Sequence, residues 1–192
     1  MVDPHLQIAV EVLWVLLPMY VASATATFPK GRGPPMDFGR NWPYDGRRIL
    51  GPSKTWSGFL FGSLFALPIA LLEAWLILLA PPSLAIVPRY GASVLDAVPV
   101  AVLLTFGAMA GDALGSFVKR RLDRPSGART LLIDQLPFVL LPVAVGLVAF
   151  PSTFDPVFLN PEGIAWLLVY TLLLHAAFNW VGYWVGLKKV PW

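Results

Sequence analysis

Five long apolar stretches constrain the fold of this chain more than any other feature of its sequence. Only 13% of the 192 residues are charged, against about 25% in soluble domains. A helix needs about 20 apolar residues to cross the hydrocarbon core of a bilayer. Because backbone polar groups in hydrocarbon need internal partners, such segments must be helical. We therefore predict an all-α integral membrane protein, a single polytopic domain over 1–192, with five transmembrane helices at roughly 6–28, 56–79, 95–118, 131–150 and 163–187.

The basic residues are distributed unevenly among the segments that connect these stretches. The loop 29–55 holds six Lys or Arg and the loop 119–130 holds five, whereas 80–94 holds one and 151–162 holds none. Loops rich in Lys and Arg remain on the cytosolic side of a membrane. The pattern, together with two lysines in the C-terminal tail, predicts two long cytosolic loops, a C-terminus inside the cell and an N-terminus outside the cell membrane.

The first apolar stretch is interpreted as a retained helix and not as a signal peptide. Its Ala22-Ser23-Ala24 segment is similar to a cleavage site, but Met1–Gln7 contains Asp3 and no Lys or Arg. A secretory signal needs a positively charged region before its apolar segment. The chain also contains no cysteine, which excludes disulfides and zinc–thiolate sites.

Two aspartates interrupt the apolar stretches near the predicted cytosolic boundary. Asp112 lies about 10 Å inside the end of its helix, with Ser116 and Lys119 on the same helical face, and Asp134 lies at similar depth on the next helix. A carboxylate at this depth needs a cation or a metal ion beside it. We predict that Asp112 and Asp134 hold one or two Mg²⁺ ions together with phosphate oxygens. The alternative is a structural ion pair of Asp112 with Lys119 or Arg120.

The first basic loop is too long for a simple connection and is interpreted as a functional segment. Lys54 and Thr55 stand at the predicted start of the second helix, where free N–H groups and the helix dipole favour anions. The other candidate residues of this loop are Asp37, Asn41, Asp45, Arg47 and Arg48.

The basic residues that follow Lys119 point elsewhere on the helix. We expect Arg120 and Arg121 to contact lipid phosphate or the membrane surface. The two residues are therefore not expected to share the face that carries Asp112.

Polar residues inside other helices have more than one interpretation. His175 and Asn179 share a face of the last predicted helix; hydrogen bonding between helices is the common role of such residues, and a direct role in the site is the alternative. Glu11 and Glu73 fall toward the outer side of their helices, far from the predicted chemistry. The roles of His175, Glu11 and Glu73 are left open.

Six short motifs connect the loops to the helix ends. They are Asp45-Gly46-Arg47-Arg48-Ile49-Leu50-Gly51, Lys54-Thr55-Trp56 with Gly58, Gly111-Asp112 with Ser116, Lys119-Arg120-Arg121, Gly127, and Asp134-Gln135. This set resembles the CDP-archaeol synthase family over nearly the whole chain. The resemblance implies a membrane enzyme that transfers the cytidylyl group of CTP to 2,3-bis-O-(geranylgeranyl)-sn-glycerol 1-phosphate. The products would be CDP-archaeol and pyrophosphate.

The resemblance also implies roles for individual residues. Asp112 and Asp134 would carry Mg²⁺, and Lys119 would act with them in catalysis. The residues implied to contact CTP or the lipid phosphate are Asn41, Asp45, Arg47, Lys54, Thr55, Ser116, Arg120, Gln135 and Asn179. The expected partners are CTP, an isoprenoid glycerol phosphate lipid and the bilayer, with neither nucleic acid nor an obligate protein partner.

A lipid or ion transporter with a charged cavity open to the cytosol is the alternative to an enzyme. A transporter would need polar groups that continue across the bilayer, for example from His175 to Glu11 and Glu73. A cavity open to one side only would contradict that alternative.

We expect a cysteine introduced at Ser126 to be labelled only from the cytosolic side of the membrane. The reason is the contrast between the two loops rich in Lys and Arg and the two that hold one and none. Labelling intact cells and inverted vesicles with a membrane-impermeant thiol reagent measures this, and labelling from outside would overturn the predicted topology.

Overall fold

The computed structural model describes residues 3–81, 86–125 and 130–186 of the chain. Within these ranges the chain is all-helical, with two isolated bridges inside the loop 29–55. Its helices are α1 (Pro4–Thr25), α2 (Trp56–Leu79), α3 (Val94–Arg121), α4 (Leu131–Gln135), α5 (Pro137–Ala149), α6 (Pro151–Phe158) and α7 (Pro161–Trp184). The positions that lie outside the described residues include Ser126, Gly127, Lys188 and Lys189.

Among the described residues, four helices, α1, α2, α3 and α7, are long and apolar enough to cross a membrane. The longest, α3, has 28 residues, which corresponds to about 42 Å, more than the hydrocarbon core of about 30 Å. Its last turn contains Lys119, Arg120 and Arg121, whose charges complement the negative end of the helix dipole. The helix therefore continues three residues beyond its predicted end at 118.

The predicted fourth segment, 131–150, forms two helices instead of one. α4 ends at Gln135 and α5 begins at Pro137. Pro137 has no N–H, so it cannot donate to the carbonyl of Ile133 and the hydrogen-bond ladder is interrupted. α5 has 13 residues, about 20 Å, which is less than a full span. The number of five spanning helices therefore stays a prediction.

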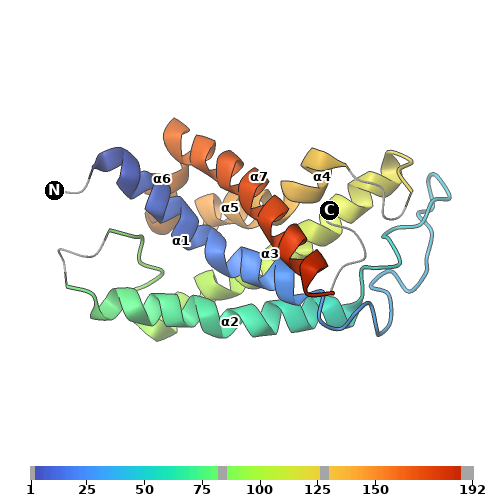
Figure 1. Ribbon diagram of the computed structural model, residues 1–192, viewed down its shortest axis with the longest axis horizontal. Helices are drawn as coiled ribbons and strands as arrows, with labels where there is room; N and C mark the ends of the chain where they lie inside the picture. Colours follow the sequence, from blue (N-terminus) through green and yellow to red (C-terminus); the bar gives the residue numbers. More distant parts are fainter. Residues whose placement is uncertain (1–2, 82–85, 126–129, 187–192) are drawn as a thin grey trace.

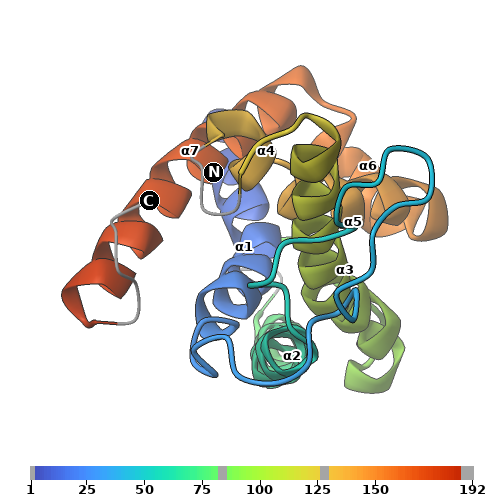
Figure 2. The ribbon, with the colours of Figure 1, turned by 90° about the vertical axis from the view of Figure 1, so that its right-hand side faces the viewer.

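The helix α2 runs along the long axis of the molecule and α1 and α7 slant across it, with α1 between α2 and α7 (Figure 1). The loop 29–55, the C-terminal end of α3 and the short helix α4 gather at one end of the bundle. Figure 2 faces this end and shows the loop lying beside α3. We call it the basic end, defined by residues 29–55, 112–124 and 131–135.

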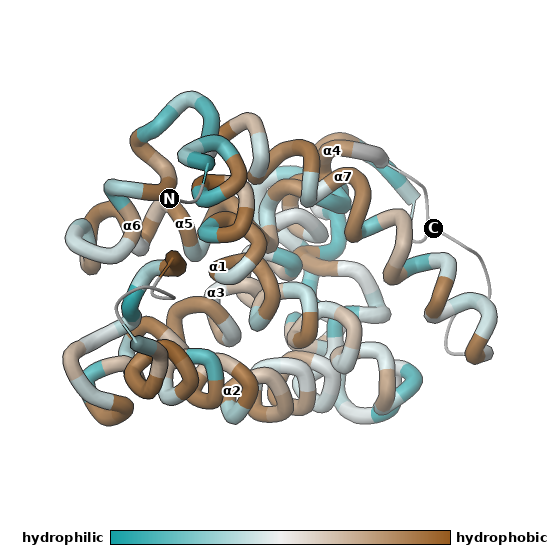
Figure 3. The backbone as a smooth tube through the Cα atoms, turned by 60° about the vertical axis from the view of Figure 1, so that its left-hand side comes forward, coloured by the Kyte–Doolittle hydropathy of each residue, from teal (hydrophilic) through white to brown (hydrophobic). Residues whose placement is uncertain are grey.

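Apolar side chains cover much of the outer surface of the helices. In Figure 3 the helices are mostly brown, and the hydrophilic residues lie mainly in the loops and at helix ends. Leu64, Phe65 and Trp75 of α2 and Leu173 and Val181 of α7 are exposed. Apolar surface on this scale is typical of contact with a membrane.

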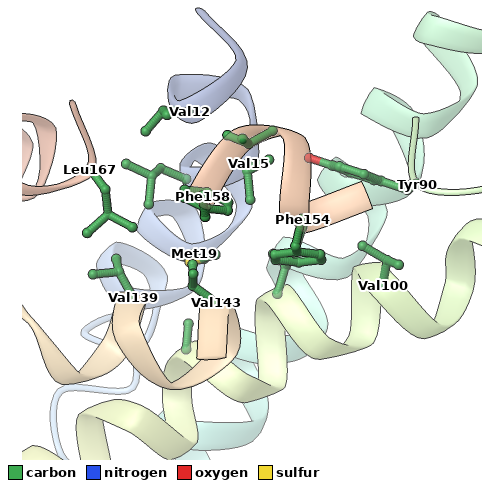
Figure 4. Packing of buried hydrophobic residues seen from close by; sticks show 14 of the residues in the cluster. Val12, Val15, Met19, Tyr90, Val100, Val139, Val143, Phe154, Phe158 and Leu167 are labelled. Atoms are coloured by element: carbon green, nitrogen blue, oxygen red, sulfur yellow. The ribbon is translucent and has the colours of Figure 1, made fainter. Parts of the chain in front are cut away.

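The core contains side chains from α1, α3, α5 and α6 (Figure 4). The helix α6 lies in 151–162, which the sequence analysis treated only as an outer loop without Lys or Arg. Phe154, Val157 and Phe158 of α6 are buried, and the Phe154 ring packs where a side chain at Gly146 of α5 would clash. The segment is helical because folding it back buries these three side chains.

Backbone of α4 and α5 lies directly against α3 at two glycines. A Cβ atom at Gly111 would be 2.2 Å from the carbonyl oxygen of Pro137, and one at Gly115 would be 2.8 Å from that of Ile133. Small residues four apart allow close helix contact in membranes. The contact places Asp112, next to Gly111, and Asp134, next to Ile133, at the same helix boundary.

We expect Gly111→Ala to destabilise the protein by about 1–3 kcal/mol, because the added methyl group would overlap the Pro137 carbonyl. The measurement is the midpoint of thermal unfolding in detergent. Gly107→Ala is the matched control, since its Cβ would lie 3.0 Å from the Cβ of Pro142 and the substitution also raises helix propensity. Equal effects of the two substitutions would contradict the close contact at Gly111.

Candidate active site

The basic end contains two lysine–carboxylate pairs. Lys54 Nζ lies 2.5 Å from Asp112 Oδ2, and Lys119 Nζ lies 2.7 Å from Asp134 Oδ1. Lys119 is the most enclosed of the four, with 11% of its side chain exposed. Because an unpaired charge would be costly there, each pair neutralises groups that the surrounding apolar helices disfavour.

The structure pairs Asp112 with a residue that the sequence analysis did not consider as its partner. Asp112 pairs with Lys54 of the first loop. Lys119 reaches across to α4 and donates to Asp134, whose second oxygen accepts from the backbone N–H of Thr130 at 2.8 Å. The side chains predicted to share one face of α3 therefore contact two different segments, since Asp112 contacts the first loop and Lys119 contacts α4.

Ser116 connects the first loop to α3. Its hydroxyl accepts a hydrogen bond of 3.0 Å from the backbone N–H of Gly51, three residues before Lys54. Lys54 N in turn donates to Gly51 O at 3.0 Å. This turn fixes where Lys54 enters the site.

The loop itself is held by a hairpin and one buried carboxylate. Trp42 N donates to Arg47 O at 2.6 Å, and Ile49 N donates to Arg40 O at 3.0 Å. Arg48 donates from two nitrogens to the two oxygens of Asp37, at 2.9 and 3.0 Å. Pairs of this geometry are among the strongest charged contacts in proteins.

The ionisation of Asp37 follows from these contacts. Burial disfavours its charged form, but hydrogen bonds from Arg48 and from the N–H groups of Gly39 and Leu50 outweigh burial and lower its pKa to about 2. The same pair raises the pKa of Arg48. The stabilisation from the Asp37 carboxylate is therefore present above its unfolded pKa, near 3.8, and is lost only as the pH falls toward 2.

Arg121 anchors the hairpin to the end of α3. Its Nε lies 3.1 Å from Asp45 Oδ2, and its Nη2 donates to Arg48 O at 2.7 Å. The guanidinium lies 4.8 Å from the centre of the Phe117 ring and 5.7 Å from that of Trp42. The sequence analysis expected Arg121 at the lipid phosphate or membrane surface, and its position against the loop corrects that expectation.

Several candidate residues have local structural partners in this arrangement. Asp45 pairs with Arg121, and Arg47 donates to Arg121 O at 2.9 Å and pairs with Asp123 at 3.4 Å. Thr55 is the N-cap of α2 and accepts from Gly58 N at 3.2 Å. Their contacts shape the loop and the start of α2.

Asn41 and Arg120 lie at the edges of the same region. Asn41 forms a bridge with Arg48 in the hairpin and is exposed. Arg120 donates to the carbonyl of Pro125 at 3.3 Å. The structure groups both with the basic end but not with the two lysine–carboxylate pairs.

Gln135 and Asn179 lie together with His175 on the other side of α4. His175 Nδ1 is 3.3 Å from Gln135 Nε2 and 2.9 Å from Asn179 Nδ2. The cluster joins α4 to α7. Helical spacing predicted the pair on α7, but the contact with Gln135 comes from the break at Pro137.

The glutamates that were left open have partners of their own. Glu73 accepts from the hydroxyl of Tyr90 at 3.0 Å, and Glu11 accepts from Gln7 at 2.8 Å. Neither contact involves His175, so these interactions do not form the polar connection that a transporter would need.

The carboxylates at the basic end suit Mg²⁺ as ligands. In the described part of the chain, no three His, Cys, Asp or Glu side chains come together. Magnesium in enzymes that act on nucleotides is commonly held by one or two carboxylates, with waters and substrate phosphates as the other ligands. Asp112 and Asp134 fit that pattern, because both border the contact of α3 with α4 and each has a lysine beside it that suits phosphate.

Comparison with known proteins matches a region that includes both lysine–carboxylate pairs. A family model described as CarS-like: CDP-archaeol synthase matches residues 5–192. The chain belongs to this family. A relative from Thermococcus gammatolerans, named CDP-archaeol synthase, is 38% identical over 180 residues, which is 94% of each chain. A relative of the same name from Archaeoglobus fulgidus is 37% identical and covers 97% of this chain and 99% of its own.

A solved structure with a similar fold supports the family membership of this chain. It is described as "Structural insight into an intramembrane enzyme for archaeal membrane lipids biosynthesis". The two sequences are 34% identical, and the two structures superimpose with a TM-score of 0.68. The match covers 88% of this chain and 93% of the other. The helices of this family member therefore form a multi-pass membrane protein, with Lys54, Asp112, Lys119 and Asp134 inside the matched region.

We expect Arg121→Lys to loosen the hairpin although it retains the positive charge. A lysine loses the planar stacking and the directed donation to Arg48 O, which should cost about 1–2 kcal/mol of local stability. Amide hydrogen exchange at Trp42, Gly46 and Ile49 should then become about tenfold faster or more. Arg124→Lys, at an exposed position past the helix end, is the control. Unchanged exchange in Arg121→Lys would show that charge alone holds the loop.

Proposed function

We propose that this chain transfers the cytidylyl group of CTP to 2,3-bis-O-(geranylgeranyl)-sn-glycerol 1-phosphate, and that the two lysine–carboxylate pairs form the reaction site. The products are CDP-archaeol and pyrophosphate. The observation that carries the proposal is the family match over residues 5–192, which contains all four residues of the pairs. Two relatives named CDP-archaeol synthase match at nearly full length.

The reaction is a substitution at phosphorus. An oxygen of the lipid phosphate attacks the α-phosphorus of CTP and forms a new P–O bond. The bond from the α-phosphorus to the bridging oxygen breaks, and its electron pair leaves with pyrophosphate. Because the attacking phosphate is already anionic, the site needs no strong general base, and positioning with charge stabilisation supplies the rate.

Lys54 and Lys119 are the cations nearest to this chemistry. Each is paired with a carboxylate, so the four groups together carry no net charge. A bound triphosphate competes for the ammonium groups, and each lysine exchanges its carboxylate for phosphate oxygens. The exchange keeps both lysines neutralised throughout binding, which avoids an isolated charge among apolar helices.

Asp112 and Asp134 are the residues that would hold Mg²⁺. The bound ion supplies positive charge beside the triphosphate and the departing pyrophosphate. The two carboxylates lie on α3 and on α4, so the site requires the glycine contact between these helices.

The first loop positions the site from the side opposite to α4. The Arg121 contacts and the Ser116 hydrogen bond hold the segment that ends at Lys54. We place this loop in the cytosol, where CTP is available, with the N-terminus of the chain outside and the C-terminus inside. The rule that basic loops stay in the cytosol supports this orientation.

The proposal is tested with purified protein, radiolabelled CTP, Mg²⁺ and the lipid phosphate in detergent micelles. We expect a labelled CDP-lipid to form, and Asp112→Asn or Asp134→Asn to reduce its rate of formation by at least about a hundredfold. Asparagine keeps the shape of each side chain and removes its charge. Chelation of Mg²⁺ should abolish the product.

Asp123→Asn is the matched control for these substitutions. Asp123 lies at the same end of the protein, its side chain is 78% exposed, and its positive φ of 57° is tolerated by asparagine. Its rate should stay close to that of the wild type. A folded Asp112→Asn protein with normal turnover would contradict the assignment of the site.

A further inference from the structure

A buried carboxylate lies far from the proposed reaction site. The helix α2 begins at the basic end, and its last turns lie at the opposite end of the bundle (Figure 1). Glu73 lies within its last two turns and is 4% exposed. In the described part of the chain, no Lys, Arg or His side chain forms an ion pair with it. An isolated carboxylate among apolar helices is costly unless a cation lies beside it.

The hydroxyl of Tyr90 connects this carboxylate to α1. Tyr90 is 3% exposed, and its Oη lies 3.0 Å from Glu73 Oε2 and 3.4 Å from the carbonyl oxygen of Trp14. The Thr153 hydroxyl of α6 donates to the neighbouring Arg89 O at 3.2 Å, which helps to hold the segment that carries Tyr90. Oxygen atoms from α1, α2 and the segment before α3 therefore come together.

The Trp14 carbonyl lacks the donor that a regular helix would supply. In an α-helix it would accept from the N–H group four residues later, but that residue is Pro18, which has no N–H. A phenol has one proton, and the Tyr90 proton is committed to Glu73 Oε2 by the shorter contact. In membrane proteins, carbonyls released from helical hydrogen bonds coordinate cations.

The second oxygen of Glu73 is also an acceptor without a donor. Glu73 Oε1 is buried and has no hydrogen-bond partner within the described structure. Trp14 Nε1 is a buried donor, but it too makes no hydrogen bond there and so does not satisfy Oε1. Because the unsatisfied atoms, Glu73 Oε1 and Trp14 O, are both acceptors, they suit a cation.

A metal cation satisfies these oxygens better than a proton does. A proton on Glu73 Oε2 could be donated to Tyr90 Oη, but it would leave Oε1 without a partner. A proton on Oε1 would have no acceptor among its described neighbours. A metal ion, in contrast, can contact several oxygens at once, and carboxylate, carbonyl and hydroxyl oxygens are the ligands that hard cations prefer.

The charge of the cluster indicates a monovalent ion. Glu73 carries the single negative charge of these three residues, so one Na⁺ or K⁺ ion neutralises it. A divalent ion would leave an uncompensated positive charge among apolar helices. The carbonyl of Trp14 and the hydroxyl of Tyr90 add ligand oxygens without adding charge.

We propose that Glu73, Tyr90 and Trp14 bind a monovalent metal cation, Na⁺ or K⁺, which joins α1, α2 and the segment before α3. The ion contacts Glu73 Oε1, a lone pair of Tyr90 Oη and the carbonyl oxygen of Trp14, while the Tyr90 hydroxyl keeps its donation to Glu73 Oε2. The site stabilises the fold at the end opposite to the reaction site, so the inference does not depend on the proposed function.

The test measures thermal unfolding in a nonionic detergent with NaCl, with KCl, or with N-methyl-D-glucamine chloride at equal ionic strength. The bulky organic cation does not enter the site. Binding to the folded state alone should raise the midpoint by about 3–6 °C when the metal ion is about tenfold above half-saturation. Equal midpoints of the wild type in all three salts would overturn the proposal and leave Glu73 as a protonated acid.

Variants of the ligands separate this site from other effects of salt. Glu73→Gln removes the charge, so its midpoint should be the same in all three salts. Tyr90→Phe removes one ligand oxygen, and half-saturation should require about tenfold more cation. Glu11→Gln is the matched control, because Glu11 is a carboxylate of α1 that accepts from Gln7 at 2.8 Å, and its response should equal that of the wild type. An undiminished response in Glu73→Gln would overturn the proposal.

Direct binding to the wild type gives a result that does not depend on how the variants fold. Radioactive sodium, or rubidium in place of K⁺, is added to the purified protein in N-methyl-D-glucamine buffer, and bound ions are counted after equilibrium dialysis. We expect about one ion per chain, retained in Glu11→Gln and lost in folded Glu73→Gln. Absence of a bound ion from the wild type would overturn the proposal.

Discussion

The close contact between the α3 backbone and the break between α4 and α5 determines the arrangement of the whole basic end. At Gly111 and Gly115 there is no room for a side chain, because carbonyl oxygens of Pro137 and Ile133 occupy the space. The carbonyl of Ile133 is available for this contact because Pro137 cannot donate to it. Without the contact, Asp134 would not reach Lys119, and the site would lose one of its two pairs.

The second constraint is that the charge of Asp112 must be neutralised by a lysine of the first loop. This constraint explains why so many contacts restrict that loop. Lys54 must reach Asp112 from a loop, which by itself would cost conformational entropy. The hairpin, the Asp37–Arg48 pair and the Arg121 contacts restrict that loop before Lys54 is reached. The Asp37 carboxylate stays ionised at all physiological pH values because its pKa is about 2, so this restriction does not depend on cellular pH.

The sequence predicted the helices well, but it predicted less well which side chains contact one another. Apolar length predicted the four long helices closely, and α3 is continuous over the three positions that helical spacing grouped, Asp112, Ser116 and Lys119. Helical spacing says nothing about which residue lies across an interface, and Lys54 is 58 positions from Asp112. The turn signal Pro43–Gly46 was available to predict the hairpin, and Pro137 to predict the helix break. The inward folding of α6 depends on tertiary burial of Phe154 and Phe158, which no local pattern reveals.

The short helix α4 explains how one protein could bring together a water-soluble nucleotide and a lipid. A continuous helix across 131–150 would keep Asp134 and Gln135 in one regular surface of a spanning segment. The break at Pro137 instead leaves a single short turn between α3 and α7, with its two polar residues directed to opposite neighbours. Asp134 contacts Lys119 at the basic end, whereas the Gln135 amide contacts His175 of α7. A reaction between a nucleotide and a lipid requires their phosphates to meet at the boundary of water and hydrocarbon, and the Lys119–Asp134 pair of α3 and α4 lies at the end of the apolar helix α3.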